Sequence, residues 1–346
     1  MKSYLKTITF LGLLVLSISC ADRVDVYQSA EDTALQVLSI TQTPGWAQDV
    51  WLTGNTAYIA DGDQGITIWD VSDPSSPLME STIRTLLSTE RVKYSPMTKL
   101  TFIKNRNGKG GVTYYDSTGR RRDSIWEDGV GDFEIIDFAP DTVAMAAVDR
   151  NDFRRALRMV VLFNDEGSWV KNDITGTYIS EVSSSSSRAL LFDRDYVYIA
   201  HNQIGVTIIE VKYETDDIIL TKIGNVDTPG AAREVCMSAD KSHIIVADFQ
   251  AGITIIDIMD KTNPTVVAEL TPDGVDQMFY VTAVGDTVYA LDNNNGMFAF
   301  DVSVPSEPRL IVRYDSPTPR GMHVDSDHTI YLADEDVGLV ILKWRN

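Results

Sequence analysis

Short runs of apolar and β-branched residues alternate with clusters of turn residues along most of the chain. In the clearest stretch the runs are Asp49–Thr53, Thr56–Ala60, Gly65–Val71 and Leu78–Ile83, separated by Gly54-Asn55, by Asp61–Gln64 and by a proline-containing turn at 72–77. Such runs, bounded by glycine, proline and asparagine, predict strands, and a Gly-Asn pair suits a tight hairpin. No segment keeps a helical period, so the pattern predicts an all-β chain built from groups of four strands.

The group of four strands recurs with a polar residue at the end of the second run and a glycine four positions later. The polar residues of the five clear copies are Asp61, His201, Asp248, Asp292 and Asp334. The last four lie 47, 44 and 42 residues apart, and the 140 residues between the first two leave room for two degenerate copies. Four strands in a period of roughly 40–45 residues are typical of a propeller blade, so we expect a β-propeller of about seven four-stranded blades.

The last copy of the repeat ends after its third strand. The segment Leu35–Ile40, ahead of the first copy, is similar to outer strands such as Thr265–Leu270. We therefore expect this N-terminal strand to complete the last blade and close the ring, which would leave no exposed sheet edge there.

The recurring run Ala-Asp-x-x-x-Gly-Ile-x-Ile-x-Asp-Val, followed by Ser-Asp-Pro-Ser-Ser-Pro at residues 72–77, resembles the LVIVD repeat family of bacterial and archaeal surface propellers. The resemblance covers roughly residues 35–346 and is strongest in copies one, five and six. It implies a propeller fold in an extracytoplasmic setting. Because the family has no agreed activity, the resemblance assigns no site residue.

The N-terminus resembles the export signal of a bacterial lipoprotein. Lys2 and Lys6 precede an apolar stretch, Ile8–Ile18, that is shorter than the roughly 20 residues needed to span a bilayer. Leu16-Ser17-Ile18-Ser19-Cys20 resembles a lipobox, although leucine stands four positions before the cysteine where lipoboxes prefer three. A cleaved, soluble secretory protein is the alternative.

This interpretation divides the chain into three parts. We expect residues 1–19 to be a signal peptide, 20–33 a polar tether lipidated at Cys20, and 34–346 a single propeller domain, with no transmembrane helix. The lipid would anchor the protein to the bacterial membrane, at the outer membrane or cell surface. Cys236 lies in an apolar run, so we expect a buried free thiol.

The formal net charge of −20 argues against general nucleic-acid binding, which needs basic surface. Basic side chains nevertheless gather on the face where the loops between blades open. They lie in long loops or near the starts of inner strands: Arg106, Arg154, Arg155, Arg188, Arg233 and Arg320, with His201 in a loop-end position. Arginine forks suit carboxylate, sulfate or phosphate groups, so we predict an anionic ligand or partner over blades two to four. Pairing with neighbouring acids is the alternative.

Acidic loops on the same face resemble the first half of a calcium site. Oxygen-bearing residues alternate before a glycine in the pairs Asp61 and Asp63, Asp292 and Asn294, and Asp334 and Asp336. The downstream bidentate acid is missing, however, and a strand follows directly. We therefore favour turn capping by the first aspartate and keep Ca²⁺ as the one cofactor that the sequence suggests.

No nucleophile elbow, metal-binding histidine pair or phosphate-cradling loop is found in the sequence. The sequence therefore favours a surface-anchored, non-catalytic binding or assembly module with an unidentified protein or glycan partner. One alternative is an extracytoplasmic hydrolase or lyase acting on a glycan, with carboxylates, His201 or His323 converging at the axis. Another is a calcium-stabilised adhesion propeller.

Overall fold

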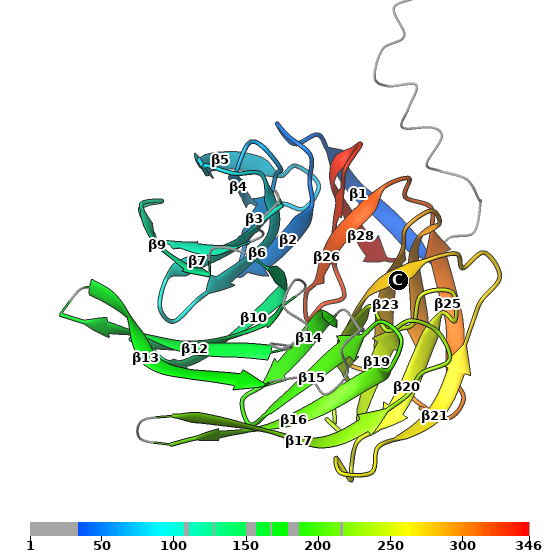
Figure 1. Cartoon of the computed structure of the whole chain (residues 1–346). Coiled ribbons are helices and arrows are strands. Elements are labelled where there is room, and N and C mark those ends of the chain that lie inside the picture. Colours follow the sequence, from blue (N-terminus) through cyan, green and yellow to red (C-terminus); the bar gives the residue numbers. More distant parts are fainter. Residues whose placement is uncertain are drawn as a thin grey trace, which may run out of the picture. The chain divides into compact units, whose positions relative to one another are not determined.

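The computed structural model describes residues 34–345 apart from gaps at 107–110, 127–128, 150–156, 167, 179–186 and 215–216. The described residues form strands and no helix (Figure 1), and the strands make seven four-stranded antiparallel sheets. No described helix is long and apolar enough to cross a membrane. The expected signal peptide, Cys20 and the tether lie outside the described residues.

Each sheet is one blade, and its four strands follow one another from the axis outward. The first four blades contain β2 (Asp49–Thr53), β3 (Thr56–Ala60), β4 (Ile66–Asp70) and β5 (Leu78–Ile83); β6 (Thr89–Ser95), β7 (Leu100–Asn105), β8 (Val112–Tyr115) and β9 (Arg121–Trp126); β10 (Val130–Ala139), β11 (Thr142–Asp149), β12 (Leu157–Asp165) and β13 (Ser168–Tyr178); β14 (Ser187–Asp193), β15 (Tyr196–His201), β16 (Gly205–Tyr213) and β17 (Ile218–Val226). The last three contain β18 (Glu234–Met237), β19 (His243–Ala247), β20 (Ile253–Asp257) and β21 (Thr265–Leu270); β22 (Met278–Val284), β23 (Thr287–Asp292), β24 (Gly296–Asp301) and β25 (Arg309–Tyr314); β26 (Pro319–Val324), β27 (Ile330–Asp334), β28 (Gly338–Trp344) and β1 (Leu35–Thr41).

The blades form a closed ring, because each innermost strand contacts the innermost strand of the next blade all the way round. The last blade takes its outer strand from the start of the propeller. There β1 pairs antiparallel with β28, from Leu35 opposite Trp344 to Thr41 opposite Leu339, and the two ends of the colour range lie side by side in Figure 1. The predicted seven blades and the predicted N-terminal closure are both confirmed, and blades two and three are regular four-stranded sheets.

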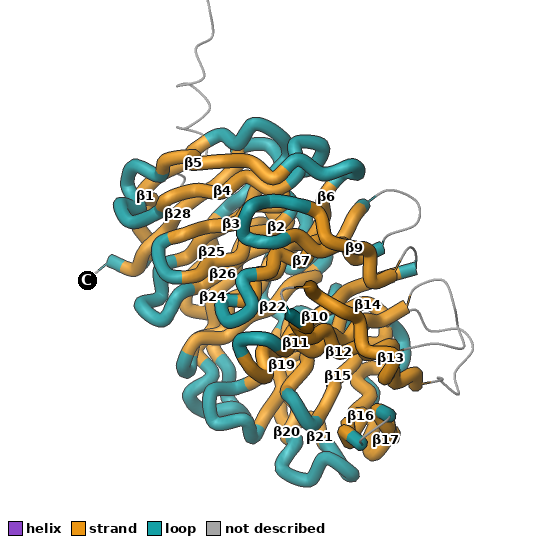
Figure 2. Tube along the Cα trace, turned by 90° about the vertical axis from the view of Figure 1, so that its left-hand side faces the viewer, coloured by secondary structure: helices purple, strands orange, loops and turns teal. Residues whose placement is uncertain are grey.

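Apolar packing between blades holds the ring together. The described residues contain seven hydrophobic clusters, and each one joins two adjacent blades. Central strands are covered on both faces, so every residue of β27 is buried, whereas β5 is mostly exposed. Figure 2 shows the strands of the blades stacked through the molecule, with loops at their ends. Cys236 is a buried free thiol, as the sequence predicts.

The repeated glycine is required by a close backbone approach. In Gly65 and its equivalents φ lies between 71° and 89°, a region that other residues adopt rarely. A Cβ atom there would overlap the carbonyl oxygen of the outer strand, for example that of Ile83 beside Gly65. At the equivalent position of blade two, Gly111 does not have a positive φ, and the equivalent position of blade three lies outside the described residues.

The ring closure predicts a stability difference between two leucines. Leu35 of β1 is 3% exposed in the cluster between blades six and seven, whereas Leu78 on an outer strand is 63% exposed. We expect Leu35→Ala to lower the free energy of unfolding in urea by about 2–4 kcal/mol and Leu78→Ala by less than about 0.5 kcal/mol. Equal effects would contradict the assignment of β1 to the last blade.

Candidate functional site

Irregular pairing at the start of the inner strands turns extra side chains toward the axis. In β6, β10, β14, β22 and β26 the register with the neighbouring strand skips one residue near the loop face. Such a bulge leaves one residue without a cross-strand partner and re-aims its side chain. The equivalent residues of the other two blades, Gln48 and Arg233, directly precede their strands. We call these seven positions the rim residues: Gln48, Glu90, Gly131, Arg188, Arg233, Phe279 and Arg320.

The next position along each inner strand lies further from the loop face. Its occupants, the deep residues, pair in register with the second strand of their blades. They are Asp49, Arg91, Asp132, Ala189, Glu234, Tyr280 and Gly321. The repeat is thus not maintained at the axis, because acidic, basic, aromatic and small residues occupy equivalent positions.

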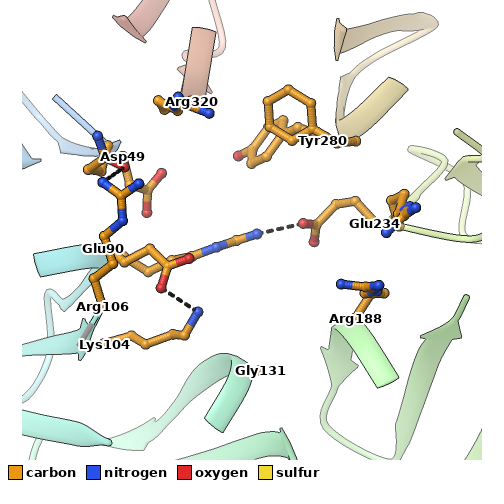
Figure 3. Close-up of a pocket in the computed structure, with 13 residues that line it drawn as sticks. Asp49, Glu90, Lys104, Arg106, Gly131, Arg188, Glu234, Tyr280 and Arg320 are labelled. Atoms are coloured by element: carbon orange, nitrogen blue, oxygen red, sulfur yellow. Dashed lines mark hydrogen bonds and ion pairs between the residues drawn. The ribbon is translucent and has the colours of Figure 1, made fainter. Parts of the chain in front are cut away.

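The rim residues and several deep residues enclose an axial cavity of about 290 Å³. Its lining holds six basic side chains and three acidic ones, a formal excess of positive charge in a chain whose net charge is −20. Figure 3 shows Arg106, Arg188 and Arg320 around this cavity, on different sides of Glu234. The basic lining residues are Arg91, Lys104, Arg106, Arg188, Arg233 and Arg320, and the acidic ones are Asp49, Glu90 and Glu234.

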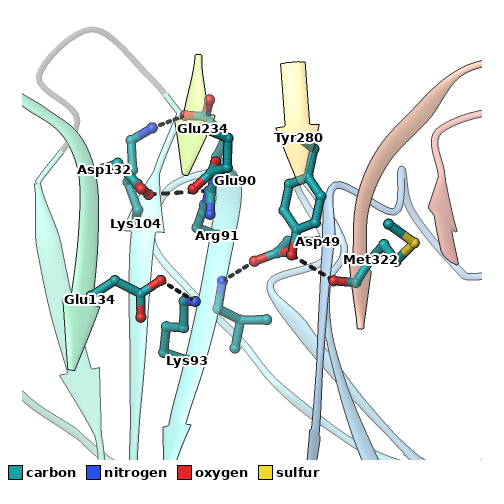
Figure 4. A network of polar contacts seen from close by, with 11 residues as sticks. Asp49, Glu90, Arg91, Lys93, Lys104, Asp132, Glu134, Glu234, Tyr280 and Met322 are labelled. Carbon is teal, nitrogen blue, oxygen red and sulfur yellow. Dashed lines mark hydrogen bonds and ion pairs between the residues drawn. The ribbon is translucent and has the colours of Figure 1, made fainter. Parts of the chain in front are cut away.

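Arg91 is at the centre of the ion pairs in this cavity. Its Nη2 donates to Glu234 Oε2 at 2.6 Å, and its Nε lies 3.2 Å from Asp132 Oδ1. One guanidinium thus links the inner strands of blades two, three and five (Figure 4). Lys104 Nζ contacts Glu90 Oε2 at 2.9 Å on the same side. These pairs tie two acids of the cavity lining, Glu234 and Glu90, to Arg91 and Lys104.

Burial perturbs the titration of the deep residues. Desolvation raises the pKa of Glu234 to about 8, and Arg91 opposes that rise. Desolvation also raises the pKa of Asp49, against the charges of Arg91 and Lys93. Tyr280 Oη donates to the carbonyl of Met322 at 2.7 Å, and burial raises its pKa further, so it is not placed to act as a base.

The arginines predicted from the sequence surround the axis. Arg106 follows β7 and Arg188 lies on β14, Arg233 precedes β18, and Arg320 lies on β26, so they come from blades two, four, five and seven. The basic sector is therefore not confined to blades two to four. Arg320 Nε donates to Glu335 Oε2 at 2.5 Å, and the Arg233 guanidinium lies 4.2 Å from the Phe249 ring centroid. Arg154 and Arg155 lie outside the described residues.

The two candidate histidines do not line the axial cavity. His201 is 1% exposed, and its Nδ1 lies 3.3 Å from Ser187 Oγ. Burial, together with the charge of Lys222, lowers its pKa to about 4. His323 packs edge-on against Trp51, and burial lowers its pKa to about 4 as well. The hydrolase or lyase interpretation therefore has carboxylates at the axis but no histidine in the cavity lining.

The repeated aspartate fastens the loop that leads into its own blade. Asp248 accepts hydrogen bonds from Thr228 Oγ1 at 2.8 Å, Gly230 N at 2.9 Å and Thr254 Oγ1 at 3.0 Å. Asp61 accepts from Thr43 Oγ1 at 2.7 Å and from Gly45 N at 3.0 Å. Asp292 and Asp334 accept backbone N–H groups from the equivalent loops of their blades. Asp292 and Asp334 also accept an N–H group of their own turn, which is the capping role that the sequence favours. For Asp61 and Asp248 the N–H donors belong to the preceding loop instead.

The residues that the calcium hypothesis pairs with these aspartates lie on the surface. Asp63, Asn294 and Asp336 are exposed, and Asp63 and Asp336 line a second cavity of about 410 Å³ beside Trp46. Within the described ranges, no group of three or more His, Cys, Asp or Glu side chains is placed to hold a metal ion. Calcium binding stays a prediction.

Sequence reasoning missed the deep residues and the threonines that bind the aspartates. The threonines had a readable signal, since Thr43-Pro44-Gly45 recurs as Thr228-Pro229-Gly230. The deep residues had none, because they follow no shared pattern and depend on the bulges for their position.

The geometry defines the class of the protein as a seven-bladed β-propeller with a charged axial cavity. The LVIVD repeat family model matches three of its blades, over residues 44–85, 229–271 and 280–316. These ranges are blades one, five and six, the copies in which the resemblance is strongest. No curated protein matches the chain.

Solved propellers share the fold at low sequence identity. The WD40 β-propeller domain of Doa1 matches with a TM-score of 0.63 at 12% identity, over 91% of this chain and 98% of that one. The β-propeller domain of Myceliophteria thermophila Cps50 (Swd1) matches with a TM-score of 0.65 at 13% identity, over 88% of this chain and 99% of that one. At such identities the likeness shows the fold alone.

The capping aspartates predict a local loss of stability. We expect Asp248→Ala to lower the free energy of unfolding by about 1–3 kcal/mol, because the hydroxyl of Thr228 and the N–H of Gly230 lose their acceptor. Asp63→Ala, at an exposed position, is the matched control. Urea unfolding measures both, and equal effects would contradict the capping role.

A melting midpoint that calcium raises only while Asp63 is present would instead support the calcium hypothesis.

Proposed function

We propose that this chain is a non-catalytic binding module that holds an anionic ligand, or an anionic group of a partner, in its axial cavity. Arg106, Arg188, Arg233 and Arg320 would bind it. The observation that carries the proposal is the convergence of these four arginines, from four blades, on one cavity of a strongly acidic chain. A guanidinium offers several donors in a planar fork, which suits the paired oxygens of carboxylate, sulfate and phosphate groups.

The cavity also limits the ligand. Its volume of about 290 Å³ is near the small end of ligand pockets, which are roughly 300–1,000 Å³. A single anionic group or a small acidic sugar fits that volume better than an extended polymer. Phe279 and Tyr280 add an apolar side to the lining. A larger partner would place only one anionic group inside.

We further propose that the propeller is held at a membrane surface outside the cytoplasm by a lipid on Cys20. Support comes from the apolar stretch Ile8–Ile18 and from the small residues directly before the cysteine. A single acyl chain binds membranes only weakly, so stable anchoring needs the several chains of a lipoprotein modification.

The axial arginines predict a loss of anion binding. Sulfate, phosphate and galacturonate serve as probes in isothermal titration calorimetry. We expect the double variant Arg188→Gln, Arg320→Gln to raise the Kd of the probe at least tenfold, because each hydrogen bond to a charged group contributes about 1.5–3 kcal/mol. Arg309→Gln is the control, since that side chain is 73% exposed on an outer strand. An unchanged Kd in the double variant would contradict the proposal.

The anchor predicts a change in fractionation. In a bacterial host that modifies lipoproteins, the wild-type chain should incorporate labelled fatty acid and sediment with membranes. We expect Cys20→Ser to abolish both, and Cys236→Ser, at the buried thiol, to leave both unchanged. Labelling that persists without Cys20 would exclude this residue as the attachment site.

A further inference from the structure

A layer of charged side chains on the inner strands, with four acids around Arg91 and Lys93, lies at and below the axial cavity. Arg91 contacts Asp132 and Glu234, and its charge also acts on Asp49. The second base, Lys93, donates to Glu134 Oε1 at 2.6 Å. Figure 4 shows the four carboxyls around these two cations. Two carboxylates therefore share the guanidinium of Arg91, and the side chains of Asp132, Glu234 and Arg91 are 1%, 8% and 19% exposed.

Two carboxylates of this layer, those of Asp132 and Glu234, share the guanidinium of Arg91. Two like charges held beside one cation repel each other, which favours the protonated form of one of them. Asp49 accepts the backbone N–H of Val92 at 3.1 Å, which favours its charged form, and Glu134 accepts a hydrogen bond from Lys93 at 2.6 Å. Of the two acids that share Arg91, Glu234 lines the cavity and Asp132 does not, so a proton that enters through the cavity reaches Glu234.

The surroundings of Glu234 agree with this assignment. Burial raises its pKa, the charge of Asp132 raises it further, and Arg91 and Lys93 lower it. Charged or titratable groups face the cavity and this layer from all seven inner strands or the residues beside them: Asp49; Glu90, Arg91 and Lys93; Asp132 and Glu134; Arg188; Arg233 and Cys236; Tyr280; and Arg320.

We propose that anion binding in the axial cavity is coupled to the uptake of one proton by the carboxylate of Glu234. The proton comes from the solvent, and the anion enters as the carboxylate becomes neutral. Neutral Glu234 no longer repels the anion, and it releases Arg91 from an ion pair so that the guanidinium can attract the anion. This inference rests on the proposed anion-binding function and adds its regulation.

The direction of the pH dependence follows from linkage. The anion binds better to the form in which Glu234 is protonated. The affinity for the anion is therefore highest at pH values below the pKa of Glu234 and falls as the pH rises through about 8. With one linked proton, the limit is a tenfold loss of affinity per pH unit. Reciprocally, the bound anion raises the affinity of Glu234 for its proton by the same factor.

The experiment measures sulfate and galacturonate binding by calorimetry from pH 6 to pH 9.5. For the wild type we expect Kd to rise toward tenfold per pH unit above about pH 8. Glu234→Gln imitates the neutral acid and can still accept a hydrogen bond from Arg91, so its Kd should stay at the low-pH value throughout. Glu80→Gln, at an exposed site on an outer strand, should behave like the wild type.

A second measurement needs no variant. Binding enthalpies at pH 8.5 in two buffers with different ionisation enthalpies give the number of protons taken up, for which we expect a value approaching one. A value of zero, or the same pH dependence in the wild type and in Glu234→Gln, would overturn the coupling and leave the anion site standing. No binding of either probe at any pH would overturn both proposals.

Discussion

The ion pairs of the half-buried Arg91 guanidinium are the interaction on which the axial site depends. Between blades, apolar side chains fill seven separate interfaces, but at the axis the seven inner strands face one another across a shared space. Bulges turn polar side chains into that space, and buried charges are tolerated there only if opposite charges balance them. Arg91 supplies this balance by joining Asp132 and Glu234 from two other blades. Removal of the guanidinium would leave these acids buried and uncompensated, so the same contact supports both the fold at the axis and the charge of the cavity.

The acidity of the whole chain and the basicity of its cavity do not conflict. Charges on a solvated surface are screened over about 8 Å at physiological ionic strength, whereas charges in a partly buried cavity are screened much less. The net charge of −20 therefore governs solubility and the approach of large polyanions, and the arginines of the lining govern what binds inside. A small anion suits this combination better than a nucleic acid, which would have to lie against the acidic surface.

The sequence predicts the architecture because the repeated residues have structural roles. The glycine before the third strand lies against a carbonyl oxygen, and the aspartate before it fastens a loop, so both recur in the clear copies of the repeat, except that His201 replaces the aspartate in blade four. The cavity could be predicted only in part. Arg188, Arg233 and Arg320 were recognisable because they stand at the starts of strands. Arg91 and Glu234 were not, since ionisable residues are common in this chain, and their pairing joins strands 143 residues apart through ring geometry. His201, a polar residue at a loop end, takes the position of the repeated aspartate and is buried outside the cavity lining, with its Nδ1 3.3 Å from Ser187 Oγ.

The most direct test of the axial anion site is anomalous diffraction from crystals of the protein soaked in selenate. The account predicts a selenium peak inside the cavity, within hydrogen-bonding distance of the guanidinium groups of Arg188 and Arg320, which sulfate in excess displaces. Selenium bound only over outer loops, with water alone between the axial arginines, would contradict it.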